Sequence, residues 1–224
     1  MEPDAVSVLL SQARILLISI LGVVALAPAP DRHGAPRIRG PLGQVVTYVG
    51  IFFLSAPWFA IPFMEQPRLA GQAAFLARTT SLVLGLAGLT LYALSLRALL
   101  PAFRGQFSEF TPGRLVTSGP YAHVRHPIYL AALSILLSVD LALGATVSVL
   151  FLPLCYGALA FVMLYEERWI LGVRFPAEYA RYRSEVRHRI LPAWASLCTG
   201  LLYLALAVPC LMNVLEVVCF EWIV

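Results

Sequence analysis

The chain of 224 residues has few charges and no lysine. Charged residues make up 12% of the sequence, whereas an ordinary soluble domain carries roughly 25%. This composition argues against a disordered chain and against a nucleic-acid-binding protein. The four cysteines, Cys155, Cys198, Cys210 and Cys219, lie in apolar runs without a CxxC pair. They are therefore interpreted as buried apolar residues, which argues against a disulfide scaffold, a metal site and a redox pair.

Apolar residues are abundant instead. Hydrophobic residues make up 60% of the chain, and the mean hydropathy is +0.81. These values predict an integral membrane protein. Because a membrane helix needs about 20 apolar residues, the length allows six or seven spans with short loops. The simplest organisation is a single integral membrane domain over residues 1–224.

Six apolar runs predict an all-α, polytopic bundle of about six transmembrane helices. They cover residues 5–27, 43–63, 79–100, 127–143, 145–165 and 197–215, and the last is expected to fray towards residue 224. The first run has no basic segment before it and no polar break after it, so we expect a retained helix and not a signal peptide. Pro57 and Pro62 are expected to bend the second helix.

The arginines predict the orientation, because cytoplasmic flanks of membrane helices are enriched in arginine and lysine. With six spans, Arg68 and Arg78 fall on one side of the membrane, and Arg14 lies within the first span. The remaining arginines all fall on the other side: Arg32, Arg37, Arg39, Arg97, Arg104, Arg114, Arg125, Arg168, Arg174, Arg181, Arg183, Arg187 and Arg189. The crowded side is therefore predicted to be cytoplasmic, with both termini on the opposite side.

Two distant segments are predicted to meet at the cytoplasmic edge. A short turn at residues 140–144 joins the fourth and fifth helices, which should then form an antiparallel hairpin. At 1.5 Å per residue, both arms return about 25–32 Å to the same membrane edge. Residues 125–129 and 165–168 are therefore expected to lie together. Asp140, at the opposite turn, is expected to be solvated.

The residues that meet there suit a ligand that carries both a positive and a negative charge. Pro127 is predicted to begin the fourth helix, so the next two backbone amides form a seat for an anion. Arg125 and His126 lie beside this seat, and Glu166 and Glu167 face it. Such a set suits a zwitterionic ligand. The alternative is a belt of charged and aromatic side chains at the membrane interface that binds no ligand.

Three other polar features leave alternatives open. His123 and His126 have the spacing of metal ligands, although a helix start at Pro127 gives His126 a simpler role. Arg14 either pairs with a carboxylate, reaches the interface or takes part in catalysis. A third set shares the spacing of one helix face and is expected to lie over a ligand or over lipid headgroups: Tyr179, Tyr182, Arg183 and Arg187.

Two ordered motifs resemble a known family. Residues 115–121 (LVTSGPY) and 125–129 (RHPIY) resemble the LVTSGxY and RHPxY signature of the isoprenylcysteine carboxyl methyltransferases. This membrane family is related to the phospholipid N-methyltransferases. The family's EE…FGxxYxxY…P tail resembles Glu166-Glu167, Phe175, Tyr179, Tyr182 and Leu191-Pro192. The resemblance divides the chain into helical scaffold spans (1–100), a methyltransferase-like core (101–192) and a C-terminal span (197–224).

The resemblance implies an integral membrane methyltransferase that uses S-adenosylmethionine in a pocket at the cytoplasmic face. The implied acceptor is lipophilic, above all the carboxylate of an isoprenylcysteine-type or prenylated substrate that enters from the lipid bilayer. The implied cofactor contacts are Gln106, Gly113, Arg114, Leu115, Val116, Tyr121, His126, Pro127, Ile128, Tyr129 and Glu167. Glu167, Arg168 and Arg183 are the expected catalytic residues, and no metal is expected.

The sequence departs from the family pattern at three positions, which are occupied by Ala131, Pro176 and Met163. Met163 stands where the family has an arginine that contacts the substrate. Two other functions remain open. An NADPH-dependent membrane reductase would use the same edge, since sterol reductases carry a similar RHPxY segment, but the chain lacks GxGxxG. A non-enzymatic protein such as a transporter subunit would show charged or broken helices at the midplane.

Overall fold

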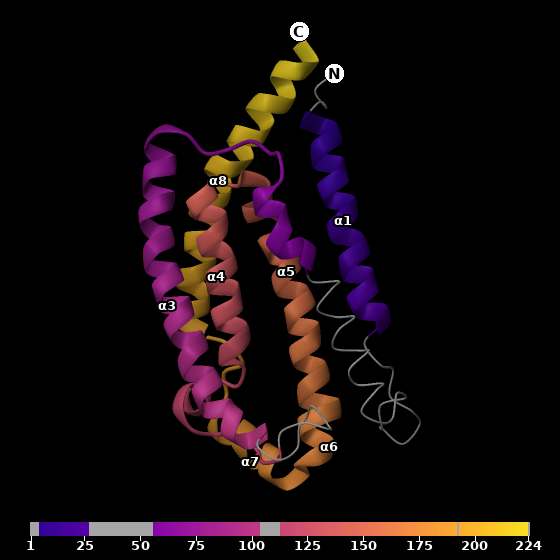
Figure 1. Ribbon diagram of the computed structural model, residues 1–224, viewed down its shortest axis with the longest axis vertical. Helices are drawn as coiled ribbons and strands as arrows, with labels where there is room; N and C mark the ends of the chain where they lie inside the picture. The colour runs from indigo at the N-terminus through magenta and orange to yellow at the C-terminus, as the bar shows by residue number, and fades with distance from the viewer. Residues whose placement is uncertain (1–4, 27–55, 104–112, 192, 224) are drawn as a thin grey trace.

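The computed structural model describes residues 5–26, 56–103, 113–191 and 193–223, and helices form all the regular elements of these ranges (Figure 1). The α-helices are α1 (Ala5–Leu26), α3 (Gly71–Phe103), α4 (Pro127–Leu143), α5 (Thr146–Tyr165), α6 (Gly172–Arg174), α7 (Pro176–Glu185) and α8 (Ala193–Ile223). Residues 61–63 (η1) and 119–122 (η2) form 3-10 turns, and η3 (Glu166–Leu171) is a π-helix. The predicted all-α fold is confirmed.

Two helices have the length and composition of membrane spans, Gly71–Ala102 and Thr146–Arg174. Only 11% and 28% of their most apolar windows are buried inside the protein. Their apolar side chains therefore face outward, which is the pattern of lipid-facing helices and not of a soluble core. Helices α1, α4 and α8 contain shorter apolar stretches. Most of the expected second span, at 43–55, lies outside the described residues, so the count of six stays a prediction.

The helix boundaries differ from the prediction at two places. Helix α3 begins at Gly71, whereas the apolar run predicted a start at residue 79. Helix α8 begins at Ala193, before the predicted start at residue 197, and stays helical to Ile223 through the part that was expected to fray. Hydrophobic runs mark the apolar part of a helix, but the backbone hydrogen bonds continue into the polar flanks.

Helices α3 and α4 pack very closely along their length. A Cβ atom added to Gly85 would lie 2.7 Å from the Ser138 hydroxyl oxygen, and one on Gly88 would lie 3.0 Å from Ile135. The Ser138 hydroxyl also donates a hydrogen bond of 2.8 Å to the Ser81 carbonyl oxygen across the interface. Small residues allow this approach, as they do in other membrane helix pairs.

The turn between α4 and α5 forms the predicted antiparallel hairpin. Gly144 ends α4 with a φ of 65°, a left-handed conformation that glycine adopts at little cost. A side chain from another segment caps α5, because the Gln66 Oε1 accepts hydrogen bonds from the Val147 and Ser148 amides at 3.0 and 3.3 Å. This cap holds residues 66–69 against the turn.

The prediction that Asp140 is solvated is wrong. Its side chain lies at the end of α4 and is only 1% exposed. The cause is the segment that crosses the turn: the Leu69 amide bonds to the Gly144 carbonyl oxygen at 2.9 Å, and the Arg68 guanidinium bonds to the Leu143 carbonyl oxygen. The apolar pattern of α4 and α5 gave no indication that residues 66–69 would cover this end.

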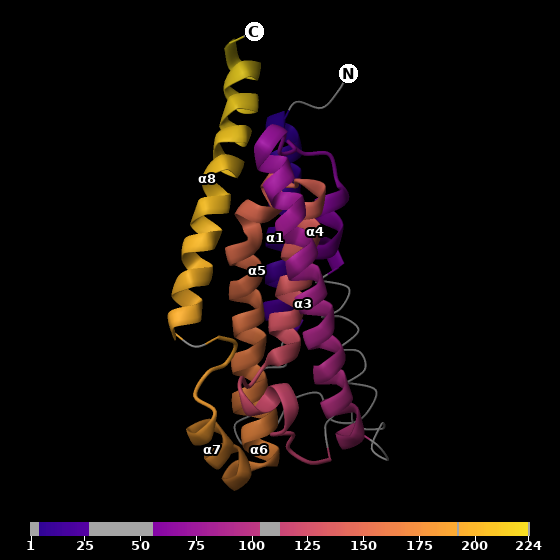
Figure 2. The same ribbon diagram turned by 90° about the vertical axis from the view of Figure 1, so that its left-hand side faces the viewer.

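Two apolar clusters join the helices. The first connects α3, α4, α5 and α8 through Leu69, Ala74, Ala77, Leu141, Val149 and Cys210. The second connects α1, α4, α5 and the segment around η1 through Leu16, Trp58, Ile61, Leu136 and Cys155. Helix α8 runs along the outside of the bundle beside α5 (Figure 2).

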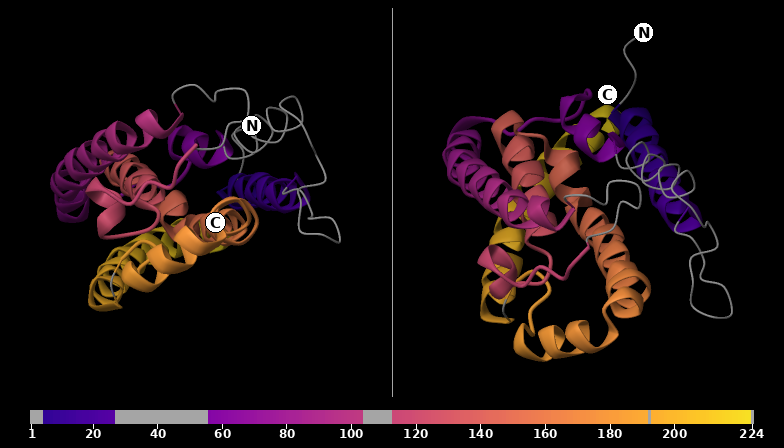
Figure 3. Two further views of the ribbon diagram at one scale, coloured as in Figure 1. Left: turned by 90° about the horizontal axis from the view of Figure 1, so that it is seen from below. Right: turned by 60° about the horizontal axis from the view of Figure 1, so that its bottom comes forward.

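The bundle has two different ends. Figure 1 shows the start of α1, the end of α8 and the α4–α5 turn at the upper end, which we call the far end. The opposite end holds the C-terminus of α3, the start of α4, and α6 and α7; we call it the site end. Helix α7 lies across this end (Figure 3). The two long polar loops therefore share one end of the bundle within the described residues, as predicted.

Candidate active site

The site begins where α4 begins. Pro127 is the first residue of α4, as predicted, and His126 is the N-cap residue. The two residues before Pro127 are also paired with the chain that follows α7. The Arg125 amide donates to the His188 carbonyl oxygen at 3.0 Å, and the His126 amide donates to the Arg189 carbonyl oxygen at 2.8 Å. This pairing fixes the backbone from which both side chains project.

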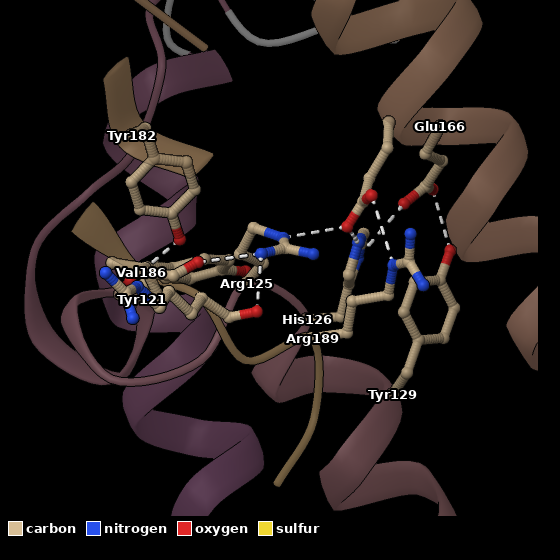
Figure 4. A network of polar contacts seen from close by, with 10 residues as sticks. Tyr121, Arg125, His126, Tyr129, Glu166, Tyr182, Val186 and Arg189 are labelled. Carbon is tan, nitrogen blue, oxygen red and sulfur yellow. Dashed lines mark hydrogen bonds and ion pairs between the residues drawn. The ribbon is translucent and has the colours of Figure 1, made fainter. Parts of the chain in front are cut away.

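The Glu167 carboxylate is the centre of the polar network (Figure 4). Its Oε1 accepts from the Arg125 Nε at 2.9 Å and contacts the His126 Nε2 at 3.1 Å. Its Oε2 accepts from the Arg189 Nε at 3.1 Å. Because a carboxylate only accepts hydrogen bonds, the contact with His126 requires the hydrogen on Nε2. The carboxylate is buried, and its cationic partners compensate for its desolvation.

Glu166 lies beside this centre, on the other side of the histidine. The Tyr129 hydroxyl donates to the Glu166 Oε1 at 2.7 Å. The His126 Nδ1 lies 3.7 Å from the Glu166 Oε2. The imidazole therefore lies between two carboxylates, one on each ring nitrogen, and this arrangement fixes its orientation.

Arg125 connects three segments of the chain. Besides Glu167, its Nη1 donates to the Val186 and Arg187 carbonyl oxygens at 2.7 and 2.9 Å. The planar guanidinium has several donors in a fixed geometry, so one side chain can bridge the start of α4, η3 and the chain after α7. Figure 4 shows Arg125 in this position.

The two glutamates reach the site from a π-helix. In η3 the Gly172 amide bonds to the Glu167 carbonyl oxygen, five residues back. A Cβ atom on Gly172 would lie 2.8 Å from the same oxygen, so the π-turn requires glycine here. Single π-turns inside longer helices are rare and often occur at functional sites. The sequence gave no signal for this turn apart from the glycine itself.

Helix α7 covers the site with two buried tyrosines. Tyr179 and Tyr182 are each 4% exposed. The Tyr182 hydroxyl donates to the Tyr121 carbonyl oxygen at 2.7 Å, which ties α7 to η2. Burial raises the pKa of Tyr182 to about 12, and it raises the pKa values of Tyr121 and Tyr179 well above the ordinary tyrosine value. These hydroxyls are therefore neutral at physiological pH.

The predicted helix face holds for the tyrosines but not for both arginines. Helix α7 ends at Glu185, so Arg187 lies beyond it and does not share the face. Arg183 is exposed. The i, i+3, i+4 pattern continued past the point where the helix ends, since Val186 leaves helical geometry.

The structure brings part of the predicted cofactor set together. His126, Tyr129 and Glu167 form the network at the start of α4. Val116 is buried against Ala102, and Leu115 packs on the tyrosine cluster of α7. The other predicted residues are placed as follows: the Gly113 amide bonds to the Ala102 carbonyl oxygen, Arg114 is exposed, Ile128 is half-buried in the first turn of α4, and Gln106 lies outside the described residues.

The two arginines that were predicted to be catalytic are both exposed, whereas the Glu167 carboxylate is buried. Arg168 is exposed, and its guanidinium stacks 5.0 Å from the Trp169 ring centroid. Arg183 is exposed on α7. Their roles stay predictions. In the described part of the chain, no group of three His, Cys, Asp or Glu side chains has the arrangement of a metal site, and His123 is exposed.

Sequence reasoning missed one partner of the network and left another without a role. Arg189 has a 41% exposed side chain that bonds to Glu167, although no motif includes it. Its position depends on the pairing of residues 188–189 with residues 125–126, which has no local sequence signal. Arg125 precedes the RHPxY histidine and was placed beside the site, but its bridging role follows only from the tertiary structure.

Comparison with known proteins gives one family match. Residues 81–178 match the model of the isoprenylcysteine carboxyl methyltransferase (ICMT) family. The central segment of the chain belongs to the ICMT family. Comparisons with curated proteins and with solved structures gave no significant match. The ICMT segment runs from α3 into α7 and includes the start of α4 and both glutamates of η3, so it contains most of the polar network. The match supports a membrane methyltransferase.

Arg189 lies after the end of the ICMT match, yet its side chain bonds to the Glu167 carboxylate. The site is therefore built from the family segment and from the chain that follows it. The two parts are joined by the backbone pairing of residues 125–126 with residues 188–189.

Proposed function

We propose that the protein transfers the methyl group of S-adenosylmethionine to the carboxylate of a lipophilic, isoprenylcysteine-type acceptor. The observation that carries the proposal is the buried network around Glu167, which lies mostly within the ICMT segment. It brings two carboxylates, a histidine and two guanidiniums together at one end of an apolar bundle. The membrane-interface belt that was the alternative is made of exposed side chains, whereas Arg125 and Glu167 are buried.

The residues of the site fit this methyl donor. S-adenosylmethionine carries a carboxylate and two cationic groups, an ammonium and a sulfonium. Glu166 and Glu167 supply acceptors for the cationic groups, and the positive N-terminal end of α4 is suited to the carboxylate. The apolar side chains of Leu115 and Val116 are suited to the adenine ring. The donor supplies an electrophilic methyl group when it is bound.

The reaction makes small demands on the protein as an acid or base. A carboxylate acceptor is already ionised at pH 7, so it needs no general base. The residues of the site then have to hold the acceptor oxygen near the methyl carbon and exclude water. If the acceptor were an amine or a thiol, His126 or Glu166 would be the candidate base, because both lie at the network.

Arg189 is the best-placed group for the acceptor carboxylate. The position of the family's substrate-contacting arginine is Met163, which is 1% exposed in α5 and carries no charge. Among the described residues, Arg189 makes a single side-chain hydrogen bond, to Glu167, and is partly exposed at the edge of the site. A guanidinium with unused donors can bind a carboxylate in bidentate fashion. Arg168 and Arg183 are the alternatives from the sequence.

The site end is proposed to face the cytoplasm, with the acceptor's hydrocarbon chain in the bilayer. Most arginines of the described segments support this orientation, because they gather at the site end, whereas Arg68 and Arg78 lie towards the far end and Arg14 lies within α1. The outward apolar faces of α3 and α5 support a multi-pass membrane location.

Methyl transfer to a defined acceptor tests the proposal. Purified protein in detergent or lipid nanodiscs is incubated with methyl-labelled S-adenosylmethionine and an N-acetyl-S-prenylcysteine. We expect a labelled methyl ester that base treatment releases as methanol, and no product from the same acceptor with its carboxylate blocked as an ester. If the label appeared on phosphatidylethanolamine instead, the proposed class of acceptor would be wrong. Reduction of an added sterol or enone by NADPH, without methyl transfer, would contradict the proposal.

A further inference from the structure

A buried polar layer lies at the far end of the bundle, away from the network at the start of α4. It consists of Gln12 of α1, Asp140 of α4, Ser148 of α5 and Gln66 of residues 65–69, which we call the crossing segment. We call these four residues the far-end layer. Gln12 is 0% exposed and Asp140 is 1% exposed. Polar and ionisable side chains inside a membrane bundle are costly, and those that occur there often have a function.

The packing of three helices brings the far-end layer to one level. Helices α1, α4 and α5 meet in one apolar cluster, to which they contribute Leu16, Leu136 and Leu152. Gln12, Asp140 and Ser148 each lie four residues from these, which is about one helical turn. In each case the turn leads towards the far end, where α1 and α5 begin and α4 ends (Figure 1). The three polar side chains therefore lie together above the apolar cluster.

Hydrogen bonds to the crossing segment connect the members of the layer. The Gln12 Nε2 donates to the Glu65 carbonyl oxygen at 2.8 Å. The next residue, Gln66, donates to the Ser148 hydroxyl oxygen at 3.5 Å and accepts from the Ser148 amide at 3.3 Å. The Ser148 hydroxyl is also near enough to the Asp140 carboxyl to hydrogen-bond with it.

Two acceptor oxygens of the layer have no donor. The Gln12 Oε1 and the Asp140 Oδ1 are buried, and neither has a hydrogen-bond partner in the described part of the chain. The bond from the Gln12 nitrogen to a carbonyl oxygen fixes the orientation of this amide, so its oxygen is the free atom. The Ser148 contact still leaves the Asp140 Oδ1 unused. Because native proteins rarely leave buried acceptors unpaired, we expect both oxygens to bind a group from outside the chain.

Asp140 also has no cationic partner. The nearby Arg68 guanidinium donates to three backbone carbonyl oxygens instead, and among the described residues no ion pair includes Asp140. A buried carboxylate without compensation is very unfavourable. A proton would remove the charge but would leave the Gln12 oxygen without a donor, because no hydrogen bond joins the two side chains. A water molecule would donate to both oxygens but would leave the charge uncompensated.

We propose that the far-end layer binds one singly charged metal cation, sodium, through the Asp140 carboxylate and the Gln12 amide oxygen. Carboxylate and carbonyl oxygens are the ligands that hard cations prefer, and one carboxylate balances one positive charge. A calcium ion takes about six to eight oxygen ligands and commonly several carboxylates, whereas the layer has one. The site is separate from the Glu167 network and does not depend on the proposed methyl transfer.

The melting temperature of the full-length protein in a non-ionic detergent tests the proposal. Sodium chloride replaces choline chloride at constant ionic strength, so that the screening of exposed charges does not change. A cation that binds only the folded protein stabilises it by mass action. The melting temperature of the parent should therefore rise by roughly 3–5 °C for each ten-fold increase in sodium above the dissociation constant. Calcium chloride at the same ionic strength should not produce this rise.

Two variants locate the effect. Asp140→Asn should abolish the response to sodium, and without sodium it should melt at or above the temperature of the parent, because it removes the uncompensated charge. Gln12→Leu should shift the sodium response to concentrations that are roughly ten-fold higher or more, since a bond to the cation is lost. Glu185→Gln and Gln72→Leu are the matched controls, because both residues are exposed. Both controls should respond to sodium like the parent.

Each other outcome overturns the proposal. A parent that melts at the same temperature in sodium and in choline does not bind the cation, and a proton or a water then satisfies the layer. A full sodium response in Asp140→Asn would place the cation elsewhere. If Asp140→Asn does not fold, an unchanged sodium response in Gln12→Leu would contradict the site in the same way. An equal or larger response to calcium would show that the site does not select a singly charged ion.

Discussion

The ion pair between Arg125 and Glu167 allows a quantitative test of the network. Both side chains are 5% exposed, and their atoms are 2.9 Å apart. Removing one partner of a buried pair typically costs about 3–5 kcal/mol of unfolding free energy, because the other charge stays buried without compensation. Arg125→Met also leaves the Val186 and Arg187 carbonyl oxygens without a donor. We therefore expect about 3–5 kcal/mol for Arg125→Met.

Glu167→Gln should be destabilising for the same reason, since it leaves Arg125 and Arg189 without their anion. The double variant should cost less than the sum of the two single variants, because each single change already removes the same interaction. The expected coupling is about 1.5–3 kcal/mol, the range for hydrogen bonds to charged groups. Unfolding in mixed detergent micelles, followed by tryptophan fluorescence, gives the free energies of unfolding for the cycle.

A second pair in the same chain provides the control. Arg181 and Glu185 are 2.8 Å apart on α7, but their side chains are 82% and 58% exposed. Solvent screening should leave little or no coupling in the same cycle on this pair. Equal coupling for the two pairs, or none for Arg125 and Glu167, would refute the claim that a buried network holds the site together.

Three further predictions concern other parts of the molecule. Gly172→Ala should lower S-adenosylhomocysteine affinity with little effect on expression, because the added Cβ would displace the Glu167 carbonyl oxygen in the π-turn. Unchanged affinity in a titration would show that ligand binding does not depend on the π-turn. Gly88→Val should cost about 1–3 kcal/mol by overpacking α3 against α4, measurable as a lower melting temperature; a variant as stable as the parent would mean that the helices are farther apart. Ser118→Cys, in a cysteine-free background, should react with an impermeant thiol reagent only from the cytoplasmic side; labelling from the outside would reverse the orientation.

Much of the site could be predicted from local sequence patterns. The proline at position 127, the turn at residues 140–144 and the apolar lengths of α4 and α5 were sufficient to place His126 and Tyr129 near the two glutamates, and the structure confirms this. These features depend on helix length and turn position, which short-range patterns record well.

The remaining features depend on long-range pairing. Arg189 reaches Glu167 because residues 125–126 pair with residues 188–189, and Asp140 is buried because residues 66–69 cross the turn. Neither contact has a periodic signal in the sequence. Arg183 shows a different error. It has the predicted helical spacing from Tyr179, but its side chain is exposed on α7. Spacing alone therefore did not decide which side chains enter the site.

The most direct test of the central claim is the affinity of S-adenosylhomocysteine for the parent and for two charge-neutralising variants. Glu167→Gln removes the central buried carboxylate, and Glu185→Gln removes an exposed carboxylate on α7 as the control. The account predicts that the parent binds S-adenosylhomocysteine and not NADPH, that Glu167→Gln weakens binding by roughly ten-fold or more, and that Glu185→Gln binds like the parent. A parent that binds NADPH and not S-adenosylhomocysteine, or a folded Glu167→Gln protein that binds as tightly as the parent, would contradict it.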